Sequence, residues 1–143
     1  MSRATITVLF SSLLLSACSQ GAKSFNDRTA LPCGESPNCV STEDTREQHH
    51  LIAFQLKSKA NIEEIEQVAL QMSGAKTATK EGNYLRIEYT SKILRFVDDL
   101  ELKVEGSKLI VRSESRVGYS DFGINRKRAD QLRTMLDSAQ LLK

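Results

Sequence analysis

Leu100-Glu101-Leu102-Lys103-Val104-Glu105-Gly106-Ser107-Lys108-Leu109-Ile110-Val111-Arg112 is the stretch of sequence that decides the fold. Apolar and charged residues alternate before Gly106-Ser107, and Leu109 and Val111 repeat the two-residue spacing of apolar residues after it. This pattern is typical of two antiparallel strands joined by a two-residue turn. We therefore expect strands over Leu94 to Val104 and Lys108 to Val117. On one face, the register sets these residues opposite one another: Val104 and Leu109, Leu102 and Val111, Leu100 and Ser113. On the other face it sets charged residues opposite one another: Glu105 and Lys108, Glu101 and Arg112, Asp99 and Glu114. The first two charged pairs are attractive, whereas the third is repulsive and needs a further partner.

A second hairpin is predicted upstream of this one. Thr77 to Lys80 and Tyr84 to Thr90 flank Glu81-Gly82-Asn83, which carries the residues of a short turn. A shorter segment, His50 to Leu56, is predicted as a first strand.

Two helices are predicted from apolar residues spaced three and four apart. Asn61 is suited to cap the first helix, Glu64 stands at the capping-box position, and Gly74 ends it. The apolar stripe of this helix is Ile62, Ile65, Val68, Ala69 and Met72. The second helix begins near Asn125, and its apolar face is Ala129, Leu132, Met135, Leu136 and Ala139.

The order strand, helix, four strands, helix predicts an α+β fold. Its expected architecture is a mostly antiparallel sheet of about five strands with two helices packed on one face. About 100 residues are enough for one core, so one domain is expected.

The N-terminus carries the order of a secretory signal. Arg3 precedes an uncharged run from Ala4 to Ala17, and Cys18 follows small residues. The run is too short to span a bilayer, which needs about 20 residues. The segment resembles the lipobox of bacterial lipoproteins. That resemblance implies removal of residues 1–17, lipidation of Cys18, a flexible tether over 18–31 and a single domain over 32–143. Because Ser19 rather than Asp follows Cys18, resemblance to enteric sorting rules implies a periplasm-facing anchor in the outer membrane.

Charge and cysteine content limit the classes of partner. Without residues 1–17 the chain holds 19 basic and 18 acidic residues, a balance that argues against nucleic-acid binding. Cys33 and Cys39 form an even pair in an oxidising compartment and are expected to form a disulfide. A metal site is less favoured, because the two histidines, His49 and His50, are adjacent and point apart in an extended chain. No metal or cofactor is predicted.

A polar group is expected where the central hairpin meets the last helix. By the alternation, Asp98 lies on the apolar face opposite Ser115, so it needs a cationic partner. Arg116 is the first choice and Arg126 the second, whereas Asp99 is expected to face solvent. Three cationic residues, 126–128, lie in the first turn of the last helix, where the helix dipole disfavours positive charge. Asp121 or a bound anion is therefore expected nearby. The candidate polar or anion site comprises Arg95, Asp98, Ser115, Arg116, Tyr119, Asp121, Asn125 and Arg126.

Three stretches together resemble the domain-of-unknown-function 1499 family. They are Cys33 to Ser41, Arg95 to Asp99, and Arg112 to Arg128, and the resemblance covers residues 31 to 140. The family carries no assigned activity, so the resemblance supports the domain boundaries and the polar group but implies no reaction.

Three functions stay open on the residues alone. The favoured one is a non-catalytic envelope lipoprotein that acts as a binding or structural module. Its partners would be the membrane, through the N-terminal lipid, and an envelope protein or an anionic ligand. A hydrolase or transferase acting on an anionic substrate would use Arg95, Arg116 and Arg126 as an electrostatic clamp, but no nucleophile–base pair is evident. A carrier of apolar molecules would need a cavity of several hundred Å³.

Overall fold

The structure is a computed structural model that describes residues 26–143. The predictions for the signal segment and for lipidation of Cys18 lie outside the described residues.

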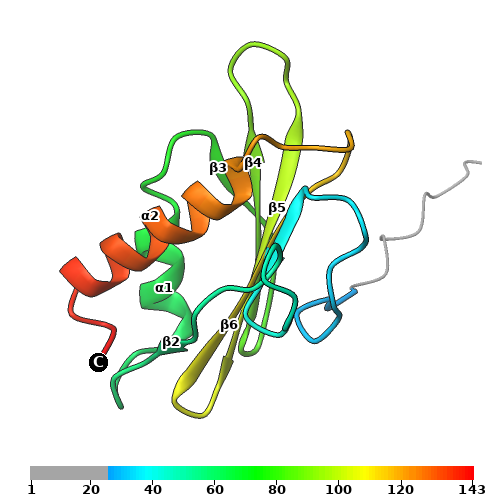
Figure 1. Cartoon of the computed structure of the whole chain (residues 1–143). Helices are drawn as coiled ribbons and strands as arrows, with labels where there is room; N and C mark the ends of the chain where they lie inside the picture. The colour runs from blue at the N-terminus through cyan, green and yellow to red at the C-terminus, as the bar shows by residue number, and fades with distance from the viewer. Residues whose placement is uncertain (1–25) are drawn as a thin grey trace, which may run out of the picture.

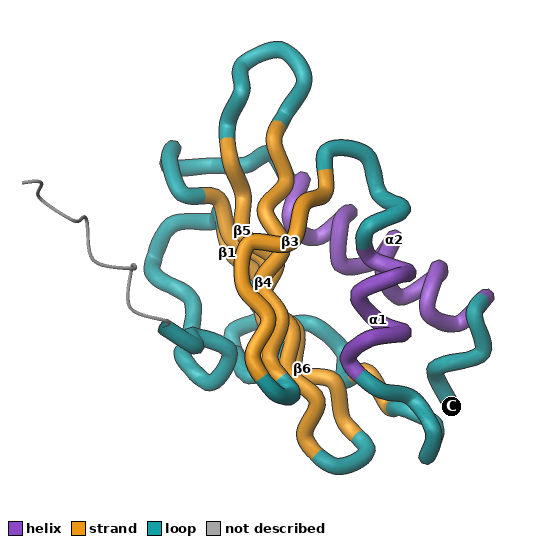
Figure 2. The backbone as a smooth tube through the Cα atoms, turned by 180° about the vertical axis from the view of Figure 1, so that it is seen from behind, coloured by secondary structure: helices purple, strands orange, loops and turns teal. Residues whose placement is uncertain are grey.

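A single antiparallel sheet forms the centre of the domain, as Figures 1 and 2 show. Its strands are β1 (Cys39–Ser41), β2 (Phe54–Gln55), β3 (Ala75–Glu81), β4 (Tyr84–Thr90), β5 (Val97–Glu105) and β6 (Lys108–Ser115). The order across the sheet is β1-β6-β5-β4-β3, and β2 also pairs with β6. Two helices, α1 (Ile62–Ala69) and α2 (Ile124–Ser138), cover one face. The predicted α+β fold is confirmed.

The register of β5 and β6 is the one that the sequence predicts. Every predicted pair is present, from Glu105 opposite Lys108 to Asp98 opposite Ser115. The turn leaves only Gly106 and Ser107 unpaired, and Gly106 has the positive φ of 58° that such turns require.

The first part of the chain differs from the prediction. β1 was not predicted, because three residues without alternation carry no recognisable strand signal. The expected strand from His50 to Leu56 is reduced to Phe54–Gln55. Arg133 of α2 donates hydrogen bonds to the carbonyls of Ile52 and Ala53, which therefore do not join the ladder.

Most of the face predicted for each helix is buried, but Ala139 is exposed and lies beyond the end of α2. α1 ends at Ala69 rather than at the expected Gly74, although Met72 beyond it is still buried. Asn61 and Glu64 form the predicted capping box of α1. The two helices pack on Leu85, Ile87 and Leu100 of the sheet, all fully buried.

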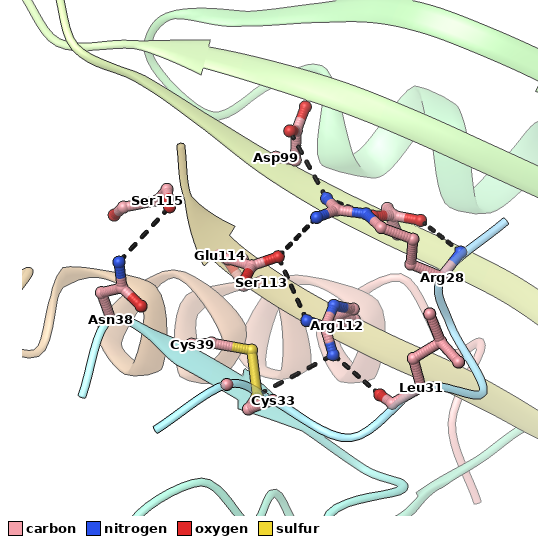
Figure 3. Close-up of polar contacts among 12 residues, drawn as sticks. Arg28, Leu31, Cys33, Asn38, Cys39, Asp99, Arg112, Ser113, Glu114 and Ser115 are labelled. Carbon is pink, nitrogen blue, oxygen red and sulfur yellow. Dashed lines mark hydrogen bonds and ion pairs between the residues drawn. A yellow bond between two sulfur atoms is a disulfide. The ribbon is translucent and has the colours of Figure 1, made fainter. Parts of the chain in front are cut away.

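The second face of the sheet is also covered, which the alternation did not predict. Residues 27–33, here called the N-terminal strap, lie across this face (Figure 1). Arg28 lies 2.6 Å from Glu101. It lies at the same distance from Glu114, as Figure 3 shows. Arg112 donates to the carbonyl of Leu31 at 2.7 Å. Residues 27–31, expected to end the flexible tether, thus contact the sheet and bury its polar face.

Candidate functional site

A pocket opens at one end of the sheet. Its walls are the β4–β5 loop (residues 91–96), the segment from Ser115 to Ile124, and the N-terminal half of α2. Its volume is about 780 Å³. Most of its exposed surface is apolar, and seven large apolar or aromatic side chains contribute to it: Met72, Tyr89, Leu94, Phe96, Val117, Phe122 and Ile124. Four charged residues also line it: Asp98, Asp121, Lys127 and Arg128.

An ion pair lies at the base of the pocket. Arg128 Nη2 is 2.7 Å from Asp98 Oδ2, and the side chains are only 11% and 13% exposed. The Arg128 guanidinium also lies 4.6 Å from the centroid of the Tyr89 ring, in cation–π geometry. Burial raises the pKa of the Tyr89 hydroxyl, which donates to the carbonyl of Ala69. The pocket base is therefore a fixed cation and anion beside an aromatic ring.

Asp98 does have a buried arginine partner, but neither of the two expected. The first choice, Arg116, lies on the opposite face of the sheet, where it binds both oxygens of Asp99 at 2.8 and 2.9 Å and also contacts Glu88. The hydrogen bonds that Arg116 donates to Asp99, and then to Glu88, raise the pKa of its guanidinium. Arg116 follows Ser115 directly, and neighbouring residues in an extended chain point to opposite faces.

Asp99 is buried at 4% exposure rather than facing solvent. The expected repulsion between Asp99 and Glu114 is relieved by Arg28, whose guanidinium lies 3.6 Å from Asp99 and 2.6 Å from Glu114.

Asn125 is the centre of a buried polar network beside the pocket. Its Nδ2 lies 2.9 Å from Ser115 Oγ, 2.8 Å from Asp121 Oδ2 and 2.9 Å from the Asn38 carbonyl. Its Oδ1 accepts from Ser113 Oγ at 2.6 Å and also from Arg128. These bonds join the start of α2 to β6 and to Asn38, the residue before β1, so Ser115, Asp121 and Asn125 do come together.

Asp121 also caps the start of α2. Its carboxylate accepts from the main-chain N–H of Gly123 at 2.9 Å and of Asn125 at 2.7 Å. The capping residue Gly123 makes no side-chain bond itself, so Asp121 supplies the negative charge expected near the three cations.

The remaining predicted residues do not converge on a common point. Arg126 donates to the carbonyls of His50 and Gln48, at 2.8 and 3.1 Å. Arg95 lies in the β4–β5 loop with φ 57°, and the Tyr119 side chain is exposed to solvent. The structure therefore separates the three arginines of the expected anion clamp.

Comparison with known proteins identifies the family of this chain but no activity. Residues 30–136 match the model of a family described as a protein of unknown function, DUF1499. The chain belongs to the DUF1499 family. No match was found among curated proteins or among solved structures.

Three further observations concern the described part of this DUF1499 chain. Cys33 and Cys39 form the predicted disulfide, with Cα atoms 5.7 Å apart. Residues 26–143 hold no cluster of three or more His, Cys, Asp or Glu side chains placed to bind a metal ion. Over the same residues there is no helix long and apolar enough to cross a membrane.

Sequence reasoning missed Arg128 and the apolar pocket lining. A signal for the lining was present, because Leu94 and Phe96 are apolar where polar residues are usual between strands. The strand expected from Leu94 included these residues, whereas β5 begins only at Val97. Arg128 carried no comparable signal, because its partner lies 30 residues away.

Proposed function

We propose that this DUF1499 chain is an envelope lipoprotein, anchored through Cys18 in the outer membrane, whose periplasmic domain is a non-catalytic binding module. The anchor is supported by the order of Arg3, the uncharged run and Cys18 at the N-terminus. The disulfide fits the same compartment, because disulfides persist in oxidising spaces.

The observation that carries the binding role is the pocket of about 780 Å³. Its volume lies within the range of roughly 300–1,000 Å³ typical of small-molecule sites. Its exposed surface is mainly apolar, and polar and charged side chains line the rest. Leu94, Phe96 and Phe122 would contact the apolar body of a ligand. The Asp98–Arg128 pair would hydrogen-bond its polar end. The ligand class is a small amphipathic molecule.

Binding fits the pocket better than catalysis does. The Ser115 hydroxyl accepts from Asn125, and in the described chain no histidine or cysteine lines the pocket. His49 and His50 instead bond to the main-chain carbonyls of Cys39 and Asp44, at 2.9 and 2.7 Å. Activating a serine needs an adjacent base, which this arrangement does not supply.

Binding of a neutral fluorescent probe, N-phenylnaphthylamine, tests the pocket. We expect saturable binding with one site per chain. Phe96→Ser should weaken this binding at least fivefold, since it removes apolar wall from the pocket. Ile52→Ser is the matched control, because Ile52 is 75% exposed and lies outside the pocket. Absence of saturable binding, or equal loss in both variants, would contradict the proposal.

Lipidation is tested separately by labelling cells with radioactive palmitate. Full-length protein should take up label, and Cys18→Ala should not. The variant should be recovered as soluble protein or as uncleaved precursor. Equal labelling and fractionation of the two proteins would refute the anchor.

A further inference from the structure

We infer that the β4–β5 loop (residues 91–96) and the segment 117–122 together form a membrane-contact surface, which places the mouth of the pocket on an anionic phospholipid bilayer. This inference rests on the proposed lipid anchor and goes beyond it, since it assigns a bilayer contact to the domain itself.

Exposed apolar side chains gather at this end of the molecule. In the described chain, seven of the ten large apolar side chains that are exposed belong to residues 93–124. Ile93 and Phe122 are 89% and 88% exposed, so neither is packed against the domain. Leu94, Phe96, Val117 and Phe122 line one pocket, which brings the two segments into a single surface. An apolar surface of this kind on a soluble domain indicates a site of interaction.

The charges around this surface suit anionic headgroups. Lys92, Arg95 and Lys127 border the apolar side chains, and within residues 26–143 none of the three makes an ion pair. Residues 91–96 contain no acidic side chain. Asp121, the acid of the second segment, is occupied by the main-chain N–H groups at the start of α2. The free charge at the pocket mouth is therefore positive.

The arrangement of the side chains favours a bilayer over a protein partner. The β4–β5 loop protrudes at one end of the sheet in Figures 1 and 2, so its residues stand at an end of the molecule. Lys92 and Arg95 lie among the apolar residues Ile93, Leu94 and Phe96. Long cationic side chains at such positions bury their stems while the charge stays at the headgroups.

The length of chain before the domain is compatible with this contact. Eight residues separate Cys18 from Asp27, where the described contacts with the sheet begin. At roughly 3.5 Å per residue, this segment reaches at most about 30 Å. A lipid on Cys18 would hold the domain within about its own diameter of the bilayer, so the loops need only orient towards it.

Depth-dependent fluorescence quenching tests the inference on the full, lipidated chain. An environment-sensitive fluorophore is placed on Ile93→Cys, and on Ser107→Cys as the control at the opposite end of β5. Cys33 and Cys39 are bonded to each other, so without reductant they do not react with the label. Both proteins are reconstituted into phosphatidylcholine vesicles with and without phosphatidylglycerol, using phospholipids that carry a spin label on the acyl chain.

The expected result is at least twofold stronger quenching at position 93 than at position 107, and stronger quenching with phosphatidylglycerol than without. Lys92→Glu combined with Arg95→Glu should remove the dependence on phosphatidylglycerol. Equal quenching at both positions while the chain floats with the vesicles would overturn the inference and leave the anchor intact. A label at position 93 that is shielded from aqueous iodide but not quenched from the lipid indicates a protein partner or second copy, and also overturns it. Failure to float, or labelling at Cys18 of the unsubstituted chain, would refute the anchor itself.

Discussion

Replacement of Asp98 tests how much the ion pair between Asp98 and Arg128 contributes to the stability of the domain. Asp98→Ala leaves the Arg128 guanidinium, only 11% exposed, without a counter-charge. Arg128 keeps its bonds to Ser113 and Asn125, but these partners are neutral. The variant should therefore be destabilised through an uncompensated buried charge.

The size of the effect follows from the burial of the pair. Breaking a fully buried pair costs about 3–5 kcal/mol. Because both side chains keep slight exposure, we expect a loss near the lower limit, about 3 kcal/mol. For a domain of this size that loss corresponds to a decrease in Tm of about 10 °C. Asp137→Ala, which removes an exposed carboxylate from the last turn of α2, should change Tm by less than about 2 °C.

A double-mutant cycle separates the ion pair from other losses. Unfolding in urea is measured for Asp98→Ala, Arg128→Met and the double variant. Once Arg128 is replaced, removal of Asp98 should cost little, giving a coupling free energy of about 2 kcal/mol. Losses that add to within about 0.5 kcal/mol would refute the reasoning, since they would show that the two side chains do not depend on each other.

Three further outcomes are expected. Reductant should expose two thiols, from Cys33 and Cys39, and lower the free energy of unfolding by about 2 kcal/mol; two reactive thiols before reduction would exclude the disulfide. A hydrogen bond from the Arg46 side chain holds the pKa of the buried Asp44 carboxyl well below its usual range. The stabilisation that this carboxylate contributes is therefore complete above about pH 4 and is lost as the pH falls through the lowered pKa. Between pH 5 and 2, Asp44→Asn should lose less stability than the natural chain. Gly74→Ala should cost about 2 kcal/mol or more in urea unfolding, because φ is +82° and the added Cβ would lie 2.7 Å from a main-chain oxygen of β4.

The sequence predicts the hairpins and the helices because their signals are local. Gly106-Ser107 and the alternation on either side determine the register of β5 and β6 without reference to the rest of the chain. The capping box of Asn61 and Glu64 does the same for the start of α1. β1 could not be found this way, because three residues paired with β6 leave no period to detect.

Long-range partners could not be predicted in the same way. Alternation correctly sets Asp98 and Asp99 on opposite faces, but it treats the second face as solvated. The N-terminal strap covers that face, so Asp99 and Glu101 are buried as deeply as core residues. Arg28, which supplies the compensating charge, lies 73 residues before Glu101, a separation over which no local pattern extends.

The contacts of Arg28 would restrict the orientation of an anchored domain on the bilayer. A lipid on Cys18 fixes only a maximum distance between the bilayer and the domain. Arg28 determines where the chain from the anchor meets the domain, because its bonds to Glu101 and Glu114 hold that chain on the sheet face opposite the helices. The loop pair at the pocket mouth lies at one end of the same sheet, on the side where β4 joins β5. One attachment at the strap and a second at the loops would restrict the rotation that a single flexible anchor permits. The mouth of the pocket would then face the bilayer, where amphipathic molecules are concentrated.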